Sequence, residues 1–231
     1  MSPATLIRKS SELGREIGAV VRQGRLIAFP KRGASPAVAD RAVIFVHGFM
    51  AAGPVFDPMR AQVEAHANVE TVGLTYGPLE RFERIAERIG SLASLAGHGR
   101  PVTIVGHSLG GLLARWYLQE LGGSVDQGGN VDRIVTIASP HAGTDKARFA
   151  PGSLGAALRP GSTTLTMLRE GRHKAASVAH VAIVAGRDRM ISPPDSAGAI
   201  DGAEVHRYDD LGHNEALFDP RVVSLVSRSV R

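Results

Sequence analysis

The sequence contains no cysteine, few aromatic residues and no long apolar run. Without cysteine the chain can form no disulfide, use no catalytic thiol and offer no thiolate to a metal. No uninterrupted apolar stretch approaches the ~18 residues of a membrane-spanning helix. The first residues also lack the basic, apolar and small-residue succession of a secretory signal. We therefore expect a cytoplasmic location without a signal peptide; an export signal removed beforehand is the alternative.

Charge and aromatic content limit the partners of the chain. The formal net charge is +5, but its arginines are spread along the sequence. Arg81, Arg84 and Arg88 alternate with glutamates on one predicted helix, which is typical of a solvated, ion-paired face. Aromatic residues make up only 5% of the chain, and no nucleic-acid-binding motif accompanies the charge. We expect no nucleic-acid partner, although a basic chain also suits an anionic membrane surface.

The most informative motif is Gly-His-Ser-Leu-Gly at 106–110. A β-branched run at 101–105 precedes it, and a helix-forming stretch at 111–118 follows at once. Strand, sharp turn and helix are the context in which Gly-x-Ser-x-Gly forms a nucleophile elbow. The turn strains its central residue, so the flanking positions need glycine. The sequence therefore predicts Ser108 as a nucleophile.

A serine nucleophile needs a base, and the base needs a group that orients it. Asp188 and His213 each follow a predicted strand, at 178–185 and 204–208, and complete the chain order Ser, Asp, His. Ligands bind along the edge where such strands end. We predict that His213 takes the proton of Ser108 and that Asp188 fixes its tautomer. Asp195 is the competing carboxylate, but its Pro-Pro-Asp-Ser context is typical of a helix cap.

These motifs resemble a known family. His-Gly-Phe at 47–49, the elbow at 106–111, Ser-Pro-His-Ala-Gly-Thr within 137–144, Asp188 and Gly-His at 212–213 are similar to the bacterial triacylglycerol lipases and esterases of the α/β-hydrolase superfamily. The resemblance runs from about residue 42 to the C-terminus. It implies an α/β-hydrolase fold, an acyl-enzyme intermediate and no cofactor.

The same resemblance implies an oxyanion hole made by the backbone amides of Phe49 and Leu109. A strand pattern at 40–46 ends in His-Gly before a loop, and backbone donors at a strand end can face developing charge. His47 is expected to hold this loop by hydrogen bonds. Phe-Met follows His-Gly where many relatives carry smaller residues, which bears on the shape of the acyl pocket. We expect the substrate to contact Phe49, Met50, His141 and Met190.

Strand and helix patterns alternate through the rest of the chain, which predicts a mostly parallel sheet with helices on both faces. The expected strands are 42–46, 69–75, 101–105, 132–138, 178–185 and 204–208. The expected helices are 55–66, 79–96, 110–121 and 220–229.

Residues 1–40 are expected to form a separate N-terminal part, and 41–231 the catalytic domain. Apolar residues recur at helical spacing among basic ones over about 4–23, and 31–40 has the composition of a linker. Packing onto the protein's own body or a dimer partner is the favoured role of this helix; interfacial membrane binding is the alternative. The sequence predicts no oligomeric state.

Between the fourth and fifth strands, residues of about 145–175 break the pattern with several glycines and prolines. A connection this long is usually functional. We predict a small cap or lid lining the acyl site, and the alternative is an ordinary excursion that covers the sheet. Phe149 and several leucines there face either the substrate or the core.

No catalytic metal is expected, because the remaining histidines lie on scattered elements without ligand spacing. Calcium at Asp209 or Asp210 is conceivable, but a lone acidic pair beside a turn is usually solvated.

Taken together, these residues predict a metal-independent serine hydrolase of lipid or other carboxylic esters, a lipase or lipase-like carboxylesterase. Acyl transfer or thioester hydrolysis by the same triad is the enzymatic alternative. A non-catalytic binding protein on the same fold is the third possibility.

Overall fold

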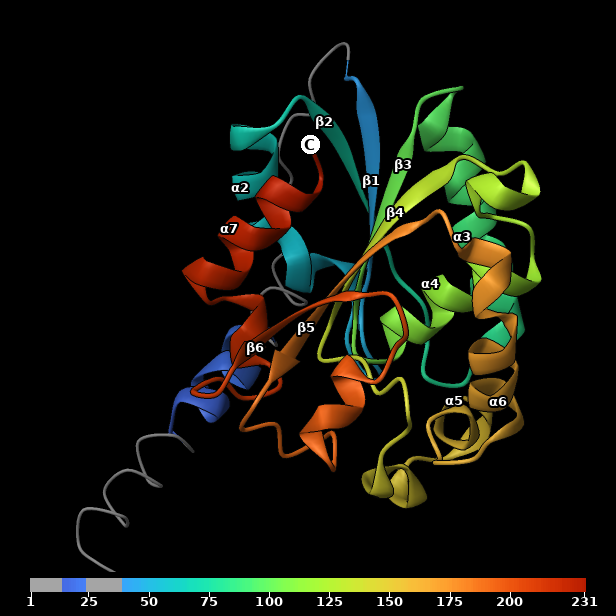
Figure 1. The fold of residues 1–231 in the computed structure, drawn as a ribbon. Coiled ribbons are helices and arrows are strands. Elements are labelled where there is room, and N and C mark those ends of the chain that lie inside the picture. The colour runs from blue at the N-terminus through green and yellow to red at the C-terminus, as the bar shows by residue number, and fades with distance from the viewer. Residues whose placement is uncertain (1–13, 24–38) are drawn as a thin grey trace, which may run out of the picture.

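The computed structural model describes residues 14–23 and 39–231 of the chain. The described residues form one sheet of six strands in the order β2-β1-β3-β4-β5-β6, with every neighbouring pair parallel (Figure 1). The strands are β1 (Arg41–Val46), β2 (Val69–Leu74), β3 (Val102–His107), β4 (Val131–Ile137), β5 (Ala179–Ala185) and β6 (Glu204–Tyr208). Their carboxyl ends consequently meet along a single edge of the sheet.

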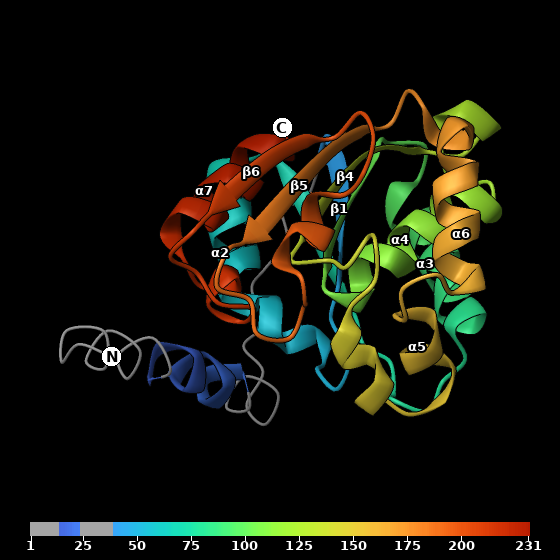
Figure 2. The same ribbon diagram turned by 60° about the horizontal axis from the view of Figure 1, so that its bottom comes forward.

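Helices cover both faces of this sheet (Figures 1 and 2). One face carries α2 (Asp57–His66) and α7 (Pro220–Ser229); the other carries α3 (Phe82–Gly97), α4 (Leu109–Glu120), α5 (Gly152–Ala157) and α6 (Thr163–Glu170). Short 3-10 turns join them: η1 (Gly53–Phe56), η2 (Val125–Gln127), η3 (Asp145–Phe149), η4 (Gly171–Ala175), η5 (Pro194–Gly198) and η6 (Glu215–Leu217). This arrangement confirms the expected parallel sheet with helices on both faces.

The central strands are apolar along their whole length because both of their faces are covered. Ile44 and Ile104 point into the core beneath α3 and α4, whereas Phe45 and Val105 point into the core beneath α2 and α7. All six residues of β3 are buried. This double burial holds the end of β3, where the elbow begins, in one position.

The expected elements match the observed ones closely, with one clear error. The helix expected from 79 begins at Phe82 instead. Glu80 accepts a hydrogen bond from the backbone N–H of Gly77 at 2.7 Å, which closes a turn ahead of the helix. Arg81 then keeps an extended backbone as the N-cap residue. Residues 79–81 therefore belong to this turn, although their side chains alone favour a helix.

Residues 14–23 are helical and rest against the segment that follows β6. Glu16 accepts hydrogen bonds from the backbone N–H of Asn214 at 2.9 Å and from the side-chain amide of Asn214 at 2.8 Å. Packing of this helix onto the protein's own body, one of the two partners in the favoured prediction, is therefore observed. Ile17 nevertheless stays exposed. The remainder of the predicted helix 4–23, and the linker up to residue 38, lie outside the described residues.

The segment at 145–175 folds into η3, α5, α6 and η4. Leu154, Leu158, Leu165 and Leu168 are buried in the same core as α3 and α4, so these side chains belong to the body of the domain. Phe149, by contrast, is exposed. A role of this segment as a cap stays a prediction.

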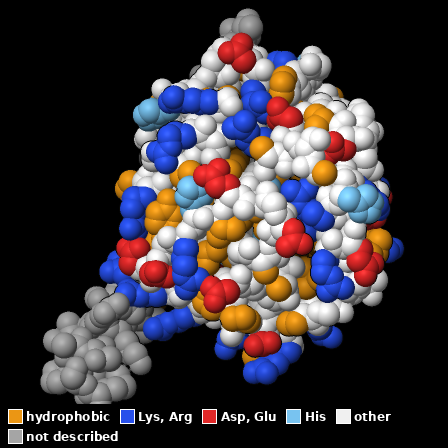
Figure 3. All heavy atoms as spheres, viewed as in Figure 1, with side chains coloured by type: hydrophobic (Ala, Val, Ile, Leu, Met, Phe, Trp, Pro, Cys, Tyr) orange, Lys and Arg blue, Asp and Glu red, His pale blue; other side chains and the backbone are white. Residues whose placement is uncertain are grey.

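The surface shows mixed charge. Figure 3 shows Lys and Arg side chains scattered among Asp and Glu on the face it presents, as the ion-paired interpretation of the basic residues predicts. Along 14–23 and 39–231, no helix combines the length and apolar character needed to cross a bilayer.

Candidate active site

Ser108 occupies the turn between β3 and α4 in a strained conformation. Its φ of 54° and ψ of −122° lie in a region that non-glycine residues rarely adopt. A Cβ on Gly106 would lie 2.6 Å from the Cα of Gly111, and a Cβ on Gly110 would lie 2.1 Å from the carbonyl oxygen of Val46. Both glycines of the motif are thus sterically required. This is the geometry expected of a nucleophile elbow, at the carboxyl edge of the sheet.

Asp188 and His213 come together at this same edge. Asp188 follows β5 and His213 follows β6, and the His213 Nδ1–Asp188 Oδ2 distance is 2.6 Å. Both side chains are buried. The other carboxylate oxygen of Asp188 accepts the backbone N–H groups of Met190 and Ile191, each at 2.7 Å. The carboxylate is therefore fixed on one side by backbone and on the other by the imidazole.

The carboxylate sets the charge preference of the imidazole. Burial alone would lower the pKa of His213, but the charge and hydrogen bond of Asp188, together with the charge of Glu16, outweigh it and raise the pKa above its ordinary value. An imidazole held in this way gives Nδ1–H to Asp188 and leaves Nε2 free to accept a proton.

His107 connects the nucleophile turn to the His213 loop. Its ring centroid lies 4.6 Å from that of His213, and its Nε2–H donates to the carbonyl oxygen of His213 at 3.2 Å. Burial holds the pKa of His107 well below its usual value, so the ring is neutral. Among the described residues, Ser108 Oγ and the His213 ring share no hydrogen bond. Transfer of the Ser108 proton to His213 therefore stays a prediction.

The loop after β1 lies against the nucleophile. A Cβ on Gly48 would lie 3.0 Å from the Cβ of Ser108, so any larger residue there would have to displace the nucleophile by a few tenths of an ångström. His47 Nδ1–H donates to the carbonyl oxygen of Gly48 at 2.7 Å, and Nε2 accepts the backbone N–H of Tyr76 at 3.1 Å. Burial lowers the pKa of His47 to about 4, which keeps the neutral tautomer that these bonds require. The expected holding role of His47 is confirmed.

Tyr76 is a residue of this site that the sequence did not single out. Its ring stacks on His47 with centroids 4.0 Å apart, and its hydroxyl donates to the carbonyl oxygen of His47 at 2.7 Å. The sequence did contain a signal for Tyr76, because this residue follows a predicted strand and therefore lies at the same edge of the sheet as Ser108. Glu16 was also missed, since nothing in its helix indicates a contact 198 residues away.

The two amides assigned to the oxyanion hole belong to separate segments, the start of α4 and the loop after β1. Leu109 is the first residue of α4, so the helix itself offers its N–H no acceptor. Phe49 directly follows Gly48, which contacts Ser108. The oxyanion role of both amides stays a prediction.

The four predicted substrate contacts differ in their surroundings. Met50 and Met190 are exposed, with 69% and 51% of their surface accessible, and Phe49 is half-buried. His141 is buried instead: its Nδ1 lies 3.2 Å from the guanidinium of Arg115 and its Nε2 lies 3.1 Å from Thr136 Oγ1. These contacts tie the ring into a polar network under α4, and its contact with substrate stays a prediction.

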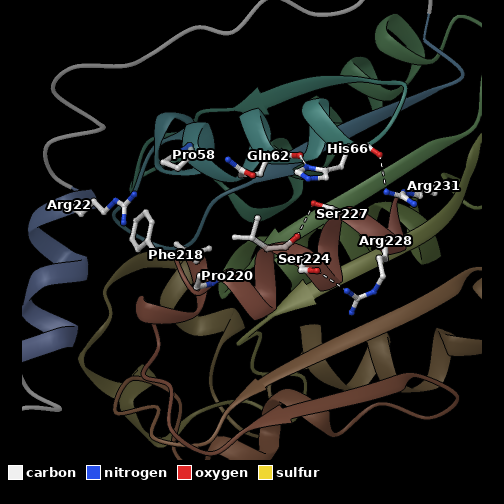
Figure 4. Close-up of a pocket in the computed structure, with 12 residues that line it drawn as sticks. Arg22, Pro58, Gln62, His66, Phe218, Pro220, Ser224, Ser227, Arg228 and Arg231 are labelled. Carbon is white, nitrogen blue, oxygen red and sulfur yellow. Dashed lines mark hydrogen bonds between the residues drawn. The ribbon is translucent and has the colours of Figure 1, made fainter.

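None of these residues lines the cavity shown in Figure 4. It has a volume of about 500 Å³ and opens between α2, α7 and the helix at 14–23. Arg22, Phe218 and Arg228 are among its lining residues, and no member of the proposed triad is. No cluster of three or more potential metal ligands occurs within 14–23 and 39–231.

Comparison with solved structures shows the α/β-hydrolase fold. Lipase BlEst2 from Bacillus licheniformis, in its mature form, superposes with a TM-score of 0.63 at 15% identity, over 85% of this chain and 94% of that chain. Lipase B from Aspergillus fumigatus superposes with a TM-score of 0.67 at 16% identity, over 86% of this chain and 54% of that chain. The RedJ thioesterase of the prodiginine pathway in Streptomyces coelicolor superposes with a TM-score of 0.56 at 18% identity, over 87% of this chain and 98% of that chain.

The sequence comparison then defines the family. A model of the palmitoyl protein thioesterase family matches residues 42–186, which is more than half of the chain. The chain belongs to this family. The match includes Ser108 and ends two residues before Asp188, so His213 also lies outside it. No curated protein matches at a significant level.

The predicted resemblance is thus confirmed at its coarser level, an α/β-hydrolase of the lipase, esterase and thioesterase type. Membership of the bacterial triacylglycerol lipases in particular stays a prediction.

Proposed function

We propose that the protein hydrolyses lipid carboxylic esters through an acyl-enzyme formed on Ser108. The proposal is carried by the buried 2.6 Å hydrogen bond between His213 and Asp188, at the sheet edge where Ser108 stands in a strained turn. A carboxylate and an imidazole buried together beside a serine elbow have the chemistry of a catalytic triad. The family match supports the same class of reaction.

The reaction runs in two halves. Ser108 Oγ attacks the ester carbonyl carbon while its proton passes to Nε2 of His213, and the backbone N–H groups of Leu109 and Phe49 hold the oxyanion. The C–O bond to the alcohol breaks as the imidazolium returns the proton to the leaving oxygen. Water then attacks the acyl-enzyme by the same route and releases the acid. Asp188 keeps its charge throughout and stabilises the imidazolium.

Exposed apolar side chains support a lipid as substrate. Four apolar side chains lie in the connections that follow β1, β2, β4 and β5, and each has more than half of its surface accessible. They are Met50, Leu79, Phe149 and Met190, in the order of these strands. All four therefore lie in connections that leave the carboxyl edge of the sheet, the edge that carries Ser108. Apolar side chains gathered from four separate loops favour a substrate with a long acyl chain, and contact with a lipid interface, over a small polar ester.

Thioester hydrolysis is the second candidate, and the palmitoyl protein thioesterase match is the observation that favours it. The same atoms would act, with a thiolate as the leaving group. A thiolate leaves more readily than an alkoxide, so a thioesterase depends less on protonation of the leaving group by His213.

A substrate panel tests both candidates. Turnover is measured on p-nitrophenyl esters of increasing chain length, emulsified triglyceride and palmitoyl-coenzyme A. Ser108→Ala should lose several orders of magnitude on every active substrate, whereas Ser91→Ala, on the exposed side of α3, should retain full activity.

Preference for long-chain esters supports the lipase or esterase. Turnover of palmitoyl-coenzyme A without turnover of esters would replace it with the thioesterase. Retained turnover in Ser108→Ala would reject the triad altogether. An ester product formed when an alcohol is added would indicate acyl transfer.

A further inference from the structure

A second cavity, of about 430 Å³, lies between α4, α6 and the turn that follows η5. Its wall contains three arginines, Arg115, Arg169 and Arg172. Asp201 is the one acidic residue among its described lining residues. Leu165 and Ile200 add apolar surface. None of the proposed triad residues lines it, and His141 is the one predicted substrate contact among its described lining residues.

Arg115 forms the buried wall of this cavity. Only 5% of its surface is accessible. Nη2–H donates to the carbonyl oxygen of Leu168 at 2.6 Å, and Nη1–H donates to Nδ1 of His141 at 3.2 Å. A guanidinium has five N–H donors, and in the described part of the chain no carboxylate pairs with this one. Burial, and then the charge of Arg172, lower the pKa of Arg115 to about 10, so it stays charged at neutral pH.

The neighbouring histidines do not supply the missing negative charge. His141 accepts from Arg115 through Nδ1, so its Nε2–H must donate to Thr136 Oγ1. Thr136 in turn donates to Nε2 of His180 at 2.9 Å. Burial holds the pKa values of both histidines well below their usual range. They are therefore neutral, and they fix the guanidinium without balancing its charge.

Arg172 and Arg169 add two further cations. Arg172 Nε–H donates to the backbone carbonyl oxygen of Asp201 at 3.1 Å, and Nη1–H donates to the carbonyl oxygen of Ala175. Like Arg115, it is therefore held by backbone oxygens. Arg169 stands at the rim with 74% of its side chain exposed, 3.8 Å from Glu170. The wall consequently carries three positive charges against the single carboxylate of Asp201.

Buried charges in proteins are normally paired, because leaving an ion uncompensated away from water is costly. Here a fixed guanidinium with spare donors faces a cavity whose described lining carries three arginines and a single carboxylate. We propose that this cavity binds a small organic anion, whose phosphate or carboxylate pairs with Arg115 and Arg172 and whose apolar part packs on Leu165 and Ile200. The volume lies within the range of small-molecule sites, about 300–1,000 Å³. The proposal does not depend on the proposed hydrolysis.

Calorimetric titration with phenyl phosphate, benzoate and neutral benzyl alcohol, at constant ionic strength in chloride, tests the proposal. We expect saturable binding of at least one anion and none of the alcohol. Arg169→Glu should weaken that binding by about tenfold, since it replaces an attractive charge at the rim of the cavity with a repulsive one. Arg84→Glu on α3 is a matched control: its side chain is also 74% exposed and also lies beside a glutamate of its own helix. It should change affinity less than ~2-fold.

A second variant also leaves Arg115 in place, because the loss of Arg115 would also destabilise α6. Ala199→Glu places a carboxylate at an exposed position of the cavity wall and should weaken anion binding by at least ~10-fold. Binding of phenyl phosphate alone would identify a phosphate ester as the ligand class, and binding of benzoate alone a carboxylate. Absence of saturable binding of both anions would overturn the proposal. Anion binding that is unchanged in both Arg169→Glu and Ala199→Glu would also overturn the proposal, since the anion would then bind elsewhere, for example at Ser108.

Discussion

At the scale of single residues, the account depends on one imidazole and its carboxylate. Asp188 uses one oxygen for His213 and the other for two backbone N–H groups, so the side chain has little freedom to turn. The raised pKa of His213 follows from this contact, against the opposing effect of burial. A base must be unprotonated to act, which ties the pKa to the pH dependence of the reaction.

The pH profile of kcat/KM should therefore fall on the acid side with an apparent pKa above 6.5. Asp188→Asn removes the charge that raises this pKa, so burial then dominates and the acid limb should move to lower pH. The activity at the optimum should drop by on the order of 10² to 10⁴. An acid limb that stays in place in Asp188→Asn would mean that another group titrates.

At the scale of elements, two local structures position the nucleophile and the base. The elbow needs glycine because the backbone of β1 passes within contact distance of α4 at Gly110. The loop after β6 needs an outside support, which the helix at 14–23 provides through Glu16. The two supports differ in kind, since the first is steric and the second is polar.

Gly110→Ala should destabilise the protein by about 3 kcal/mol or more, because the added methyl group would overlap the carbonyl oxygen of Val46. Urea denaturation monitored by circular dichroism measures the loss. Gly18→Ala is the control: its added Cβ meets no atom within 4 Å and its φ is negative. That variant should be neutral or slightly stabilising, since alanine favours a helix. Equal stability of the two variants would refute the steric account of the elbow.

Glu16→Ala should lower kcat by roughly 3- to 30-fold with little change in KM, because the loop that carries His213 loses its support. Glu16→Gln keeps an acceptor oxygen and should restore most of kcat. Its acid limb should nevertheless move to lower pH, since the charge of Glu16 contributes to the raised pKa of His213. An exposed control, Glu83→Gln on α3, should change neither quantity. A Gln variant no better than the Ala variant would contradict the positioning role.

At the scale of the whole molecule, buried neutral histidines couple stability to pH. His47, His107, His141 and His180 all have pKa values lowered by burial. The folded state therefore binds fewer protons than the unfolded chain once the pH falls below about 6.5. Their contribution to stability is present above that pH and is lost as the pH falls toward their folded pKa values. The raised pKa of His213 changes stability in the opposite direction, but His213 is a single group against these four histidines.

The free energy of unfolding should accordingly decrease between about pH 6.5 and pH 4, before most carboxylates are protonated. Chemical denaturation at a series of pH values measures this slope. His47→Gln, which can still hydrogen-bond to Tyr76, should flatten it in proportion to one histidine. A slope unchanged in that variant would show that His47 is not the neutral buried group described above.

The sequence predicted the central strands well because they are apolar runs bounded by glycine or a polar turn, as at 101–107. The Asp188–His213 pair was predicted from strand ends, which parallel topology brings to one edge. Contacts between distant surfaces were not predictable: neither Glu16 at Asn214 nor Arg115 at His141 has a local signal. The leucines of 145–175 illustrate the same limit, since apolar spacing does not tell a core face from a substrate face.

Mapping the site of covalent labelling by a fluorophosphonate tests the central claim most directly. After reaction, peptide mass spectrometry should find a single adduct, on the peptide that contains Ser108. The adduct should be absent in Ser108→Ala and should form much more slowly in His213→Ala, because the hydroxyl then lacks its base. An adduct on another residue, or labelling of Ser108 that is indifferent to His213, would contradict the account.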